Sequence, residues 1–363
     1  MIIQLAATVL AIAGSGNGAR HDSAAVHTRI DSVRREIVIT VNSISIPAAE
    51  AADAGGHHGA EIRLPVEWPV KGWMRGWHID VLDSAGNLLP REMLHHAGVV
   101  NLDRRQLAYP VPERLVASGS ETKPVLLPAS MGVPMTPDQH LVLFYMLTNH
   151  TATPVGGATL RVTINYTPDR ENGPRNVMPF IVDAFVGQNG GDRSFDLQPG
   201  LSETSAEFTI ATGGHLRALG AHLHDYAVEI RLEDVATNKV LARLKTKRDS
   251  TGRVMSVGST KFLLKWGGLR LKADHKYRVV GVYDNPTCAV IPQGAMAVLV
   301  GVFIPDDMSR WPAVNRTDPL YAEDYAQLLS SDQTMGHGMD DMDGMEMGHT
   351  ASSAPRAKCA TAK

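Results

Sequence analysis

The sequence has almost no cysteine and no excess of positive charge. Only Cys288 and Cys359 occur among 363 residues, so disulfides cannot be what holds the fold together, even in an oxidising compartment. We expect both thiols to be unpaired. The formal net charge is −3, and no cluster of Lys and Arg is interleaved with aromatic residues. A nucleic-acid partner is therefore not expected.

The sequence also lacks a long apolar run. The apolar segment at residues 1–13 is too short to span a bilayer as a stable helix, and small residues follow it. This pattern is typical of a secretory signal, with a buried first strand as the alternative. We therefore expect residues 1–22 to hold a signal peptide and the start of a linker, in a secreted or periplasmic protein. No other segment approaches transmembrane length, so no stable membrane span is expected.

Glycine and proline are abundant, with 33 and 21 residues, whereas helical periodicity is scarce. This composition favours many short strands and turns, and the length is sufficient for two domains, each with its own core. The sequence thus predicts an all-β protein. The alternation of apolar and polar residues places strands at 36–47, 73–83, 158–167, 180–186, 206–210, 226–232, 240–244, 261–266, 276–283 and 295–304.

A His-x-His segment is the central motif of the chain. Side chains alternate along a strand, so His222 and His224 share one face while Leu223 points the other way. Two imidazoles on one face can bind a metal ion together. The alternative is that both are ordinary polar residues on the solvated face of a strand.

Two further segments point to copper. Met296 opens a very apolar strand downstream, and a thioether beside two imidazoles suits copper, Cu(I) especially. Upstream, His95 and His96 are adjacent and lead into another strand. Adjacent residues on a regular strand face opposite ways, so joint metal binding by this pair requires a bulge or a strand end that turns both rings inward.

A His-His pair, a His-x-His and a Met on a late strand, in this order, resemble the copper type II ascorbate-dependent monooxygenases. That family includes peptidylglycine hydroxylating monooxygenase and dopamine beta-monooxygenase, and the resemblance spans roughly residues 35 to 305. It implies two tandem jelly-roll β-sandwich domains with one copper each. His95 and His96 then match the electron-donating site, and His222, His224 and Met296 match the site that activates oxygen.

The chain departs from the family at three positions. Met146 stands where the enzymes carry the third His of the donor site, and a thioether there changes the redox potential. His140 and His150 are alternative third ligands, and core packing is an alternative role for Met146. Gly220 and Val300 replace the Arg and Tyr that hold the peptide in the peptide-hydroxylating members, so we do not expect a peptidyl-glycine substrate.

Two polar residues are expected to support the oxygen site. Asp225 directly follows His224, where a carboxylate could orient an imidazole by accepting its second N–H. His215 lies seven residues ahead of His222, and we expect it either to support the site from behind or to be structural.

The predicted organisation has five parts. After the signal segment come the first sandwich at 34–168 and the second at 176–306. A helical extension at 307–332 follows, in which Asp318 and Pro319 form an N-cap and first-turn proline, with Leu320, Tyr321, Leu328 and Leu329 on its apolar side. Residues 333–363 have almost no branched aliphatic residues and no aromatic ones, so they are predicted to be disordered.

The tail is rich in Met and His. As a flexible set of thioether and imidazole ligands it is predicted to capture copper, with inert filler as the alternative. The residues concerned are Met335, His337, Met339, Met342, Met345, Met347 and His349.

The sequence thus favours a copper monooxygenase-like protein that hydroxylates a C–H bond of an unidentified small molecule, using O₂ and an ascorbate-like reductant. We assign no catalytic residue beyond the metal ligands. The alternative is a non-catalytic copper-binding or copper-handling protein on the same scaffold. A third reading is a metal-free extracellular adhesion or sugar-binding sandwich.

Overall fold

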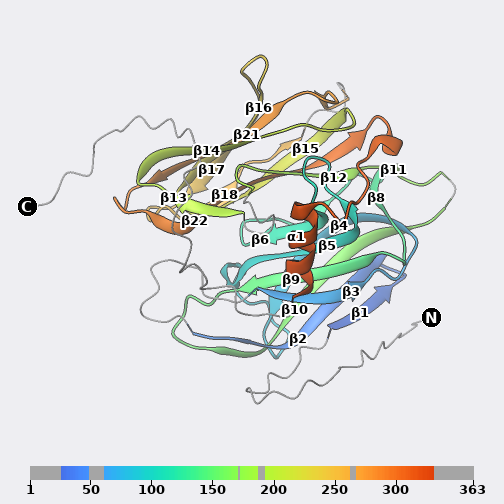
Figure 1. The fold of residues 1–363 in the computed structure, drawn as a ribbon. Helices are drawn as coiled ribbons and strands as arrows, with labels where there is room; N and C mark the ends of the chain where they lie inside the picture. The colour runs from blue at the N-terminus through green and yellow to red at the C-terminus, as the bar shows by residue number, and fades with distance from the viewer. Residues whose placement is uncertain (1–25, 49–60, 171, 187–192, 262–266, 331–363) are drawn as a thin grey trace, which may run out of the picture.

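The computed structural model describes residues 26–48, 61–170, 172–186, 193–261 and 267–330. The expected signal segment, the Met- and His-rich tail and most of the strand expected at 261–266 lie outside these residues. The described part of the chain consists almost entirely of β-strands (Figure 1). It also contains one α-helix and two short 3₁₀ turns, η1 (Arg91–Met93) and η3 (Met308–Arg310).

The first domain is a sandwich of two sheets. Its strands are β1 (Val26–Asp31), β2 (Glu36–Ile46), β3 (Ile62–Glu67), β4 (Gly72–Leu82), β5 (Leu94–Arg105), β6 (Pro112–Gly119), β7 (Val125–Leu126), β8 (Met131–Met135), β9 (His140–Leu147), β10 (Val155–Pro168) and β11 (Arg175–Asn176). One sheet has the order β1-β2-β10-β4-β8-β11, with β7 on β4, and the other has β3-β9-β5-β6. This interleaving of strands from the two halves of the domain is the Greek-key arrangement of a jelly roll.

The second domain repeats the arrangement. Its strands are β12 (Met178–Asp183), β13 (Ser194–Leu197), β14 (Gly200–Phe208), β15 (Gly214–Leu223), β16 (Ala227–Asp234), β17 (Lys239–Arg248), β18 (Val254–Val257), β19 (Thr260–Lys261), β20 (Leu269–Leu271), β21 (Tyr277–Asn285) and β22 (Ile291–Pro305). One sheet has the order β12-β22-β15-β19, with β13 on β22 and β20 on β15, and the other has β14-β21-β16-β17-β18. The prediction of an all-β fold with two jelly-roll sandwiches is confirmed.

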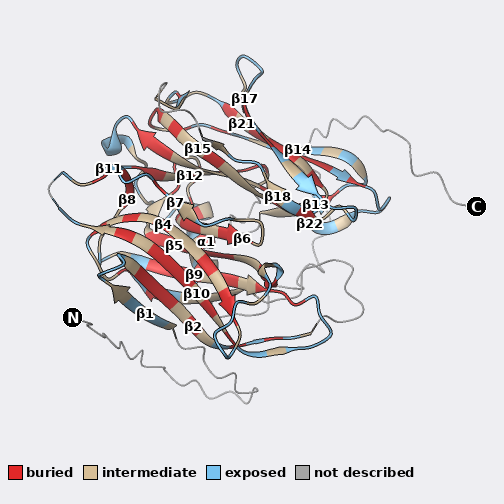
Figure 2. Ribbon diagram, turned by 180° about the vertical axis from the view of Figure 1, so that it is seen from behind, coloured by how far each residue is buried: buried red, intermediate tan, exposed pale blue. Residues whose placement is uncertain are grey.

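The alternation read from the sequence explains how the core of each sandwich forms. On β2, Ile37 and Ile39 are buried and lie opposite Ile164 and Val162 of β10. Such cross-strand apolar pairs stabilise the sheet and present one continuous apolar face to the other layer. Figure 2 shows buried residues as red bands along β2, β5, β9 and β10.

The two sandwiches also pack against each other. Leu107, Tyr109 and Val111, which lie between β5 and β6 of the first domain, belong to the apolar core of the second. In the other direction, Ile304 and Val302 of β22 pack against the core of the first. The domains are therefore joined by apolar contacts as well as by the chain that links them.

Helix α1 (Pro319–Leu329) returns to the first domain (Figure 1). The Asp318 carboxylate caps it by accepting the N–H groups of Leu320 and Tyr321. Tyr321 is fully buried, and its hydroxyl donates to the Leu102 carbonyl at 2.6 Å. Leu329, expected on the apolar side, is instead 53% exposed. It is the last residue of α1 and does not belong to the buried face of the helix, which contains Tyr321, Asp324 and Leu328.

The expectation of an unpaired Cys288 is wrong, since its sulfur is disulfide-bonded. The other cysteine of the chain, Cys359, lies outside the described residues. The bond does not hold either sandwich together, because each core is continuous without it. Within the described ranges, no helix has the length and apolar character that crossing a membrane requires.

Candidate metal centre

His95 and His96 lie at an irregular start of β5. Leu94 pairs with Leu147 of β9 and His96 pairs with Met146, and the register shifts between these two pairs. Such a shift is the bulge that joint use of adjacent histidines requires. The centres of the two imidazole rings are 5.0 Å apart.

His222 and His224 lie where β15 ends. Leu223 between them is buried in the core at 3% exposure, so the two imidazoles lie on the opposite face. Their ring centres are 5.3 Å apart and their planes are nearly perpendicular, at 85°.

The two pairs meet at the junction of the domains. The ring centres of His95 and His224 are 5.6 Å apart, so the four rings form a continuous series in the order His96, His95, His224, His222. We call these four residues the histidine row. The sequence assigned them to two separate sites, one in each domain, whereas the structure brings them together.

The spacing within the row suits metal binding by pairs. Two imidazoles bound at about 2 Å to one tetrahedral ion have ring centres roughly 5 Å apart, close to each neighbouring distance in the row. In the described part of the chain, however, no three His, Cys, Asp or Glu side chains are placed to hold one ion together. Each pair therefore needs a further ligand of another kind.

A thioether lies beside each pair. Met146 is directly opposite His96 on β9, and directly opposed residues project their side chains from the same face. Met296 lies next to His224 on β22, where its carbonyl accepts the His224 backbone N–H at 3.2 Å. Both methionines are half-buried. Each histidine pair, together with its methionine, can thus offer a metal ion two nitrogens and one sulfur.

Glu61 fixes the orientation of the His96 ring. The Nε2 atom of His96 lies 2.8 Å from the Glu61 carboxylate, which also pairs with Arg63 at 2.7 Å. Burial raises the pKa of Glu61, but the hydrogen bond and charge of His96, together with Arg63, outweigh burial and hold the pKa below its usual value. The ionised carboxylate accepts a hydrogen bond from Nε2–H, which leaves Nδ1 for a metal.

Glu121 does the same for His222 from the other domain. The Nδ1 atom of His222 lies 2.8 Å from a Glu121 oxygen, and only 7% of the Glu121 side chain is exposed. Burial raises the pKa of Glu121, yet the charge and hydrogen bond of His222 lower it overall. Burial lowers the pKa of His222, but the charge and hydrogen bond of Glu121 outweigh burial, so the pKa of His222 is raised overall.

The second nitrogen of His222 is available to bind a metal ion. Its Nε2 atom is buried and has no hydrogen-bond partner among the described residues. A buried polar atom without a partner costs free energy, so native structures rarely leave one unless something binds there. Imidazole nitrogen next to thioether sulfur is a donor set that copper favours, so these residues fit the expected metal.

The structure places neither alternative third ligand opposite His96. His140 begins β9, about 20 Å along the strand from Met146, and its side chain is 77% exposed and paired with Asp103 at 2.9 Å. His150 is exposed in the loop that follows β9. Of the three candidates, Met146 is the one directly opposite His96.

The two expected supporting residues have backbone partners. The carboxylate of Asp225 accepts the backbone N–H of Val254 at 2.9 Å. His215 stands at the start of β15, paired with Arg270 and Ile304, seven residues from His222. The carboxylates that orient the row are Glu61 and Glu121, which the sequence reasoning missed.

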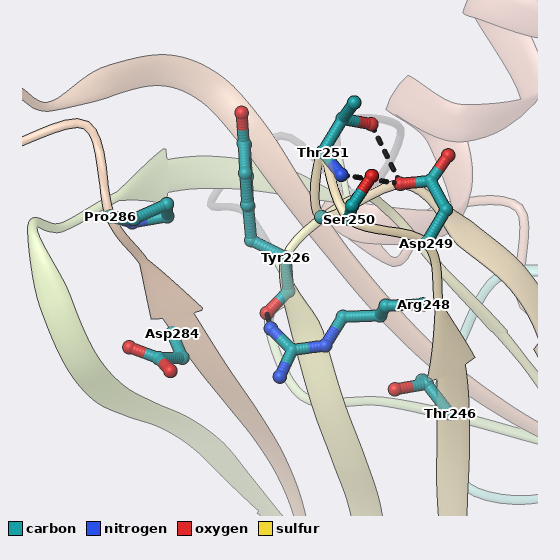
Figure 3. A pocket seen from close by; sticks show the side chains of 9 residues that line it. Tyr226, Thr246, Arg248, Asp249, Ser250, Thr251, Asp284 and Pro286 are labelled. Carbon is teal, nitrogen blue, oxygen red and sulfur yellow. Dashed lines mark hydrogen bonds between the residues drawn. The ribbon is translucent and has the colours of Figure 1, made fainter.

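A polar hollow of about 480 Å³ lies beside Tyr226, two residues after His224 (Figure 3). Tyr226 adopts a left-handed φ of 64°, and its carbonyl accepts a hydrogen bond from Arg248 at 3.3 Å. On one rim, Asp249 accepts hydrogen bonds from the backbone N–H and the hydroxyl of Thr251. No residue of the histidine row lines this hollow, so it is separate from the candidate metal centre.

No protein-family model matches the chain, and no curated protein matches its sequence. Among solved structures, the chain is similar to STIV MCP, with 11% identity and a TM-score of 0.33 over 74% of this chain and 96% of that chain. It is also similar to PNGase F, a glycosylasparaginase from Flavobacterium meningosepticum, with 8% identity and a TM-score of 0.32 over 72% of this chain and 95% of that one. At these values the similarities carry no argument about what this chain does.

Proposed function

We propose that the protein is a secreted or periplasmic copper protein that resembles the copper type II ascorbate-dependent monooxygenases, with the histidine row as its metal centre. The observation that carries the proposal is the buried Nε2 of His222, which has no hydrogen-bond partner in the described part of the chain and belongs to a ring 5.3 Å from that of His224. Burying this nitrogen without a partner costs free energy, and coordination to a metal ion would offset that cost.

The donor atoms favour copper over other biological metals. Zinc sites are built from imidazole, thiolate and carboxylate, whereas thioether sulfur is a soft ligand that selects Cu(I). Both histidine pairs have a methionine beside them and an orienting carboxylate behind them. Carboxylate–histidine pairs of this kind fix ring tautomers in metal sites.

Bound copper would supply one-electron redox chemistry and oxygen activation. His95, His96 and Met146 would hold the electron-donating ion, and His222, His224 and Met296 would hold the ion that meets O₂. Because the rings of His95 and His224 are 5.6 Å apart, the two ligand sets are in direct side-chain contact. The substrate would be a small molecule hydroxylated at a C–H bond, with an ascorbate-like reductant.

The alternative is a copper-handling protein without catalysis. Met146 in the position of an imidazole favours Cu(I), the form in which copper is exchanged between thioether ligands. The tail would then be the working part, since it concentrates Met335, His337, Met339, Met342, Met345, Met347 and His349. In that case, deleting residues 333–363 would remove most of the copper capacity.

The test is copper binding followed by oxygen consumption. His222→Ala should abolish tight copper binding at the second pair, whereas His140→Ala, which alters an exposed histidine outside the row, should leave it unchanged. Ascorbate-dependent oxygen uptake by the copper-loaded protein would identify an enzyme, and tight binding without uptake would identify a copper handler. Tight copper binding at the second pair that survives in His222→Ala would refute the site.

A further inference from the structure

We propose that Glu121 of the first domain is a positioning residue that selects the metal-binding nitrogen of His222 in the second domain. The second histidine pair would then be complete only while the two domains are docked. This inference rests on the proposed copper function. It adds that the first domain supplies a side chain that the metal site of the second domain requires.

The contact itself crosses the domain boundary. Glu121 lies in the turn after β6, and His222 lies 101 residues later on β15. The carboxylate accepts a hydrogen bond from His222 Nδ1–H, and a neutral imidazole that donates from Nδ1 has its lone pair on Nε2. Nε2 is the buried atom that lacks a partner among the described residues. A carboxylate of the first domain therefore determines which nitrogen of His222, in the second domain, can bind a metal.

The turn that carries Glu121 is shaped around its carboxylate. Gly119 donates its backbone N–H to the Thr122 hydroxyl at 3.0 Å, and its carbonyl accepts the Thr122 N–H at 3.1 Å. A Cβ atom on Gly119 would lie 2.3 Å from one Glu121 carboxylate oxygen and 2.8 Å from the other. Because position 119 has no side chain, the Glu121 carboxylate has room to fold over the turn and reach His222.

Arg91 ties this turn to the other histidine pair. Its guanidinium donates to the carbonyls of Gly119, Ser120 and Thr122 at 3.1, 3.3 and 2.7 Å. Arg91 begins the short η1 turn that leads directly into β5, four residues before His95. One side chain thus supports both the carboxylate that orients His222 and the strand start that carries His95 and His96.

Docking and metal binding are linked as a consequence. The only hydrogen bond that the described residues make to the His222 ring comes from the first domain. If the domains separated, His222 would lose the group that fixes its tautomer, and its affinity for copper would fall. A ligand that binds only the docked state favours that state in return.

The test uses the full chain in two variants and one control. Glu121→Gln replaces the ionised acceptor with a weaker neutral one of the same shape, and Gly119→Ala keeps the carboxylate but displaces it. Glu92→Gln alters an exposed carboxylate next to Arg91 and serves as the control. The first measurement is the pair of ring ¹⁵N shifts of His222 in metal-free protein, at a pH where the ring is neutral.

Wild-type protein and Glu92→Gln should show Nδ1 protonated and Nε2 unprotonated, whereas both test variants should show a mixture of tautomers. Cu(I) affinity at the second pair, measured by competition with a chromogenic chelator, should fall by roughly 10- to 100-fold in both test variants. Unchanged His222 shifts in both would overturn the positioning role even if copper binds. A Glu121-dependent tautomer in a protein that binds no copper would support the positioning role and refute the proposed function.

Discussion

In the proposed copper centre, the redox chemistry of the first histidine pair depends on Met146. It lies opposite His96, while its neighbours Tyr145 and Leu147 are buried in the core at 3% and 8% exposure. Its side chain therefore projects from the histidine face of β9 and not into the core. A thioether in this position stabilises Cu(I) and raises the potential, which makes electron donation to a second copper less favourable.

Met146→His should lower the reduction potential of copper at the first pair and raise any ascorbate-dependent oxygen uptake, because a third imidazole stabilises Cu(II) relative to Cu(I). Redox titration of the copper-loaded protein measures the first effect, and an oxygen electrode measures the second. Met255→Leu, on the exposed side of β18, is the control. A potential that does not change in Met146→His would show that Met146 is not a ligand.

At this scale the sequence indicated the histidines of the row but not the carboxylates that contact them. That His222 and His224 share a face follows from the two-residue period of a strand, which is a local property. Glu121 could not be identified in this way, because its partner is 101 residues away and nothing in the turn around it indicates burial. Glu61 was equally hidden, since its contact with His96 depends on how β3, β9 and β5 are ordered in one sheet.

At the scale of elements, the approach of β5 to β9 holds the first histidine pair in place. Gly98 of β5 lies opposite Phe144 of β9, and the Phe144 ring centre is 5.9 Å from that of His96. A Cβ on Gly98 would lie 2.6 Å from the Phe144 ring and 2.4 Å from the Val116 carbonyl. The aromatic ring can therefore pack beside the histidines only because position 98 has no side chain.

Gly98→Ala should destabilise the protein by about 1–3 kcal/mol through overpacking. It should also weaken copper binding at the first pair, because the displaced Phe144 ring moves toward His96. Denaturant unfolding and a copper titration measure the two effects. Gly156→Ala, where an added Cβ meets nothing within 4 Å, is the matched control. Equal stability of the two variants would contradict the packing argument.

Helix α1 is held to the first domain by a buried ion pair. The two terminal guanidinium nitrogens of Arg114, Nη1 and Nη2, donate to the Asp324 carboxylate. The Arg114 and Asp324 side chains are 14% and 2% exposed. Removing one partner leaves a buried charge uncompensated, so Asp324→Ala should cost about 3–5 kcal/mol of unfolding free energy. Glu323→Ala, one residue away and without an ion pair among the described residues, should cost far less. Chemical denaturation of the two variants distinguishes them.

Local patterns indicated most elements, and their failures have physical causes. The capping carboxylate of Asp318 was recognisable because it requires only the next few residues. On β16, alternation places Glu229 on the face opposite the core residues Ile230 and Leu232. Glu229 is nevertheless only 5% exposed, because Arg231 and Arg243 pair with it and neutralise its charge. An ion-pair cluster of this kind depends on the neighbouring strand and cannot be predicted from one strand alone.

At the scale of the whole molecule, the histidine row exists only because the domains pack in one orientation. Leu107, Tyr109 and Val111 of the first domain enter the core of the second, and this apolar contact brings His95 within 5.6 Å of His224, measured between ring centres. In the sequence these three residues look like any loop between strands. The resemblance to the copper monooxygenases therefore predicted two sites, one per domain, and could not show that they adjoin.

Copper should consequently stabilise both domains together. Binding at a centre shared by the domains favours the docked state, by about 2.7 kcal/mol when free copper is 100 times the dissociation constant. In differential scanning calorimetry of the wild-type protein, copper should shift the unfolding of both domains upward as one transition. His222→Ala should reduce the shift of the first domain as well as the second, although residue 222 belongs to the second alone. Two independent sites would instead leave the copper-induced shift of the first domain intact in His222→Ala, and His140→Ala should retain the full wild-type response in either case.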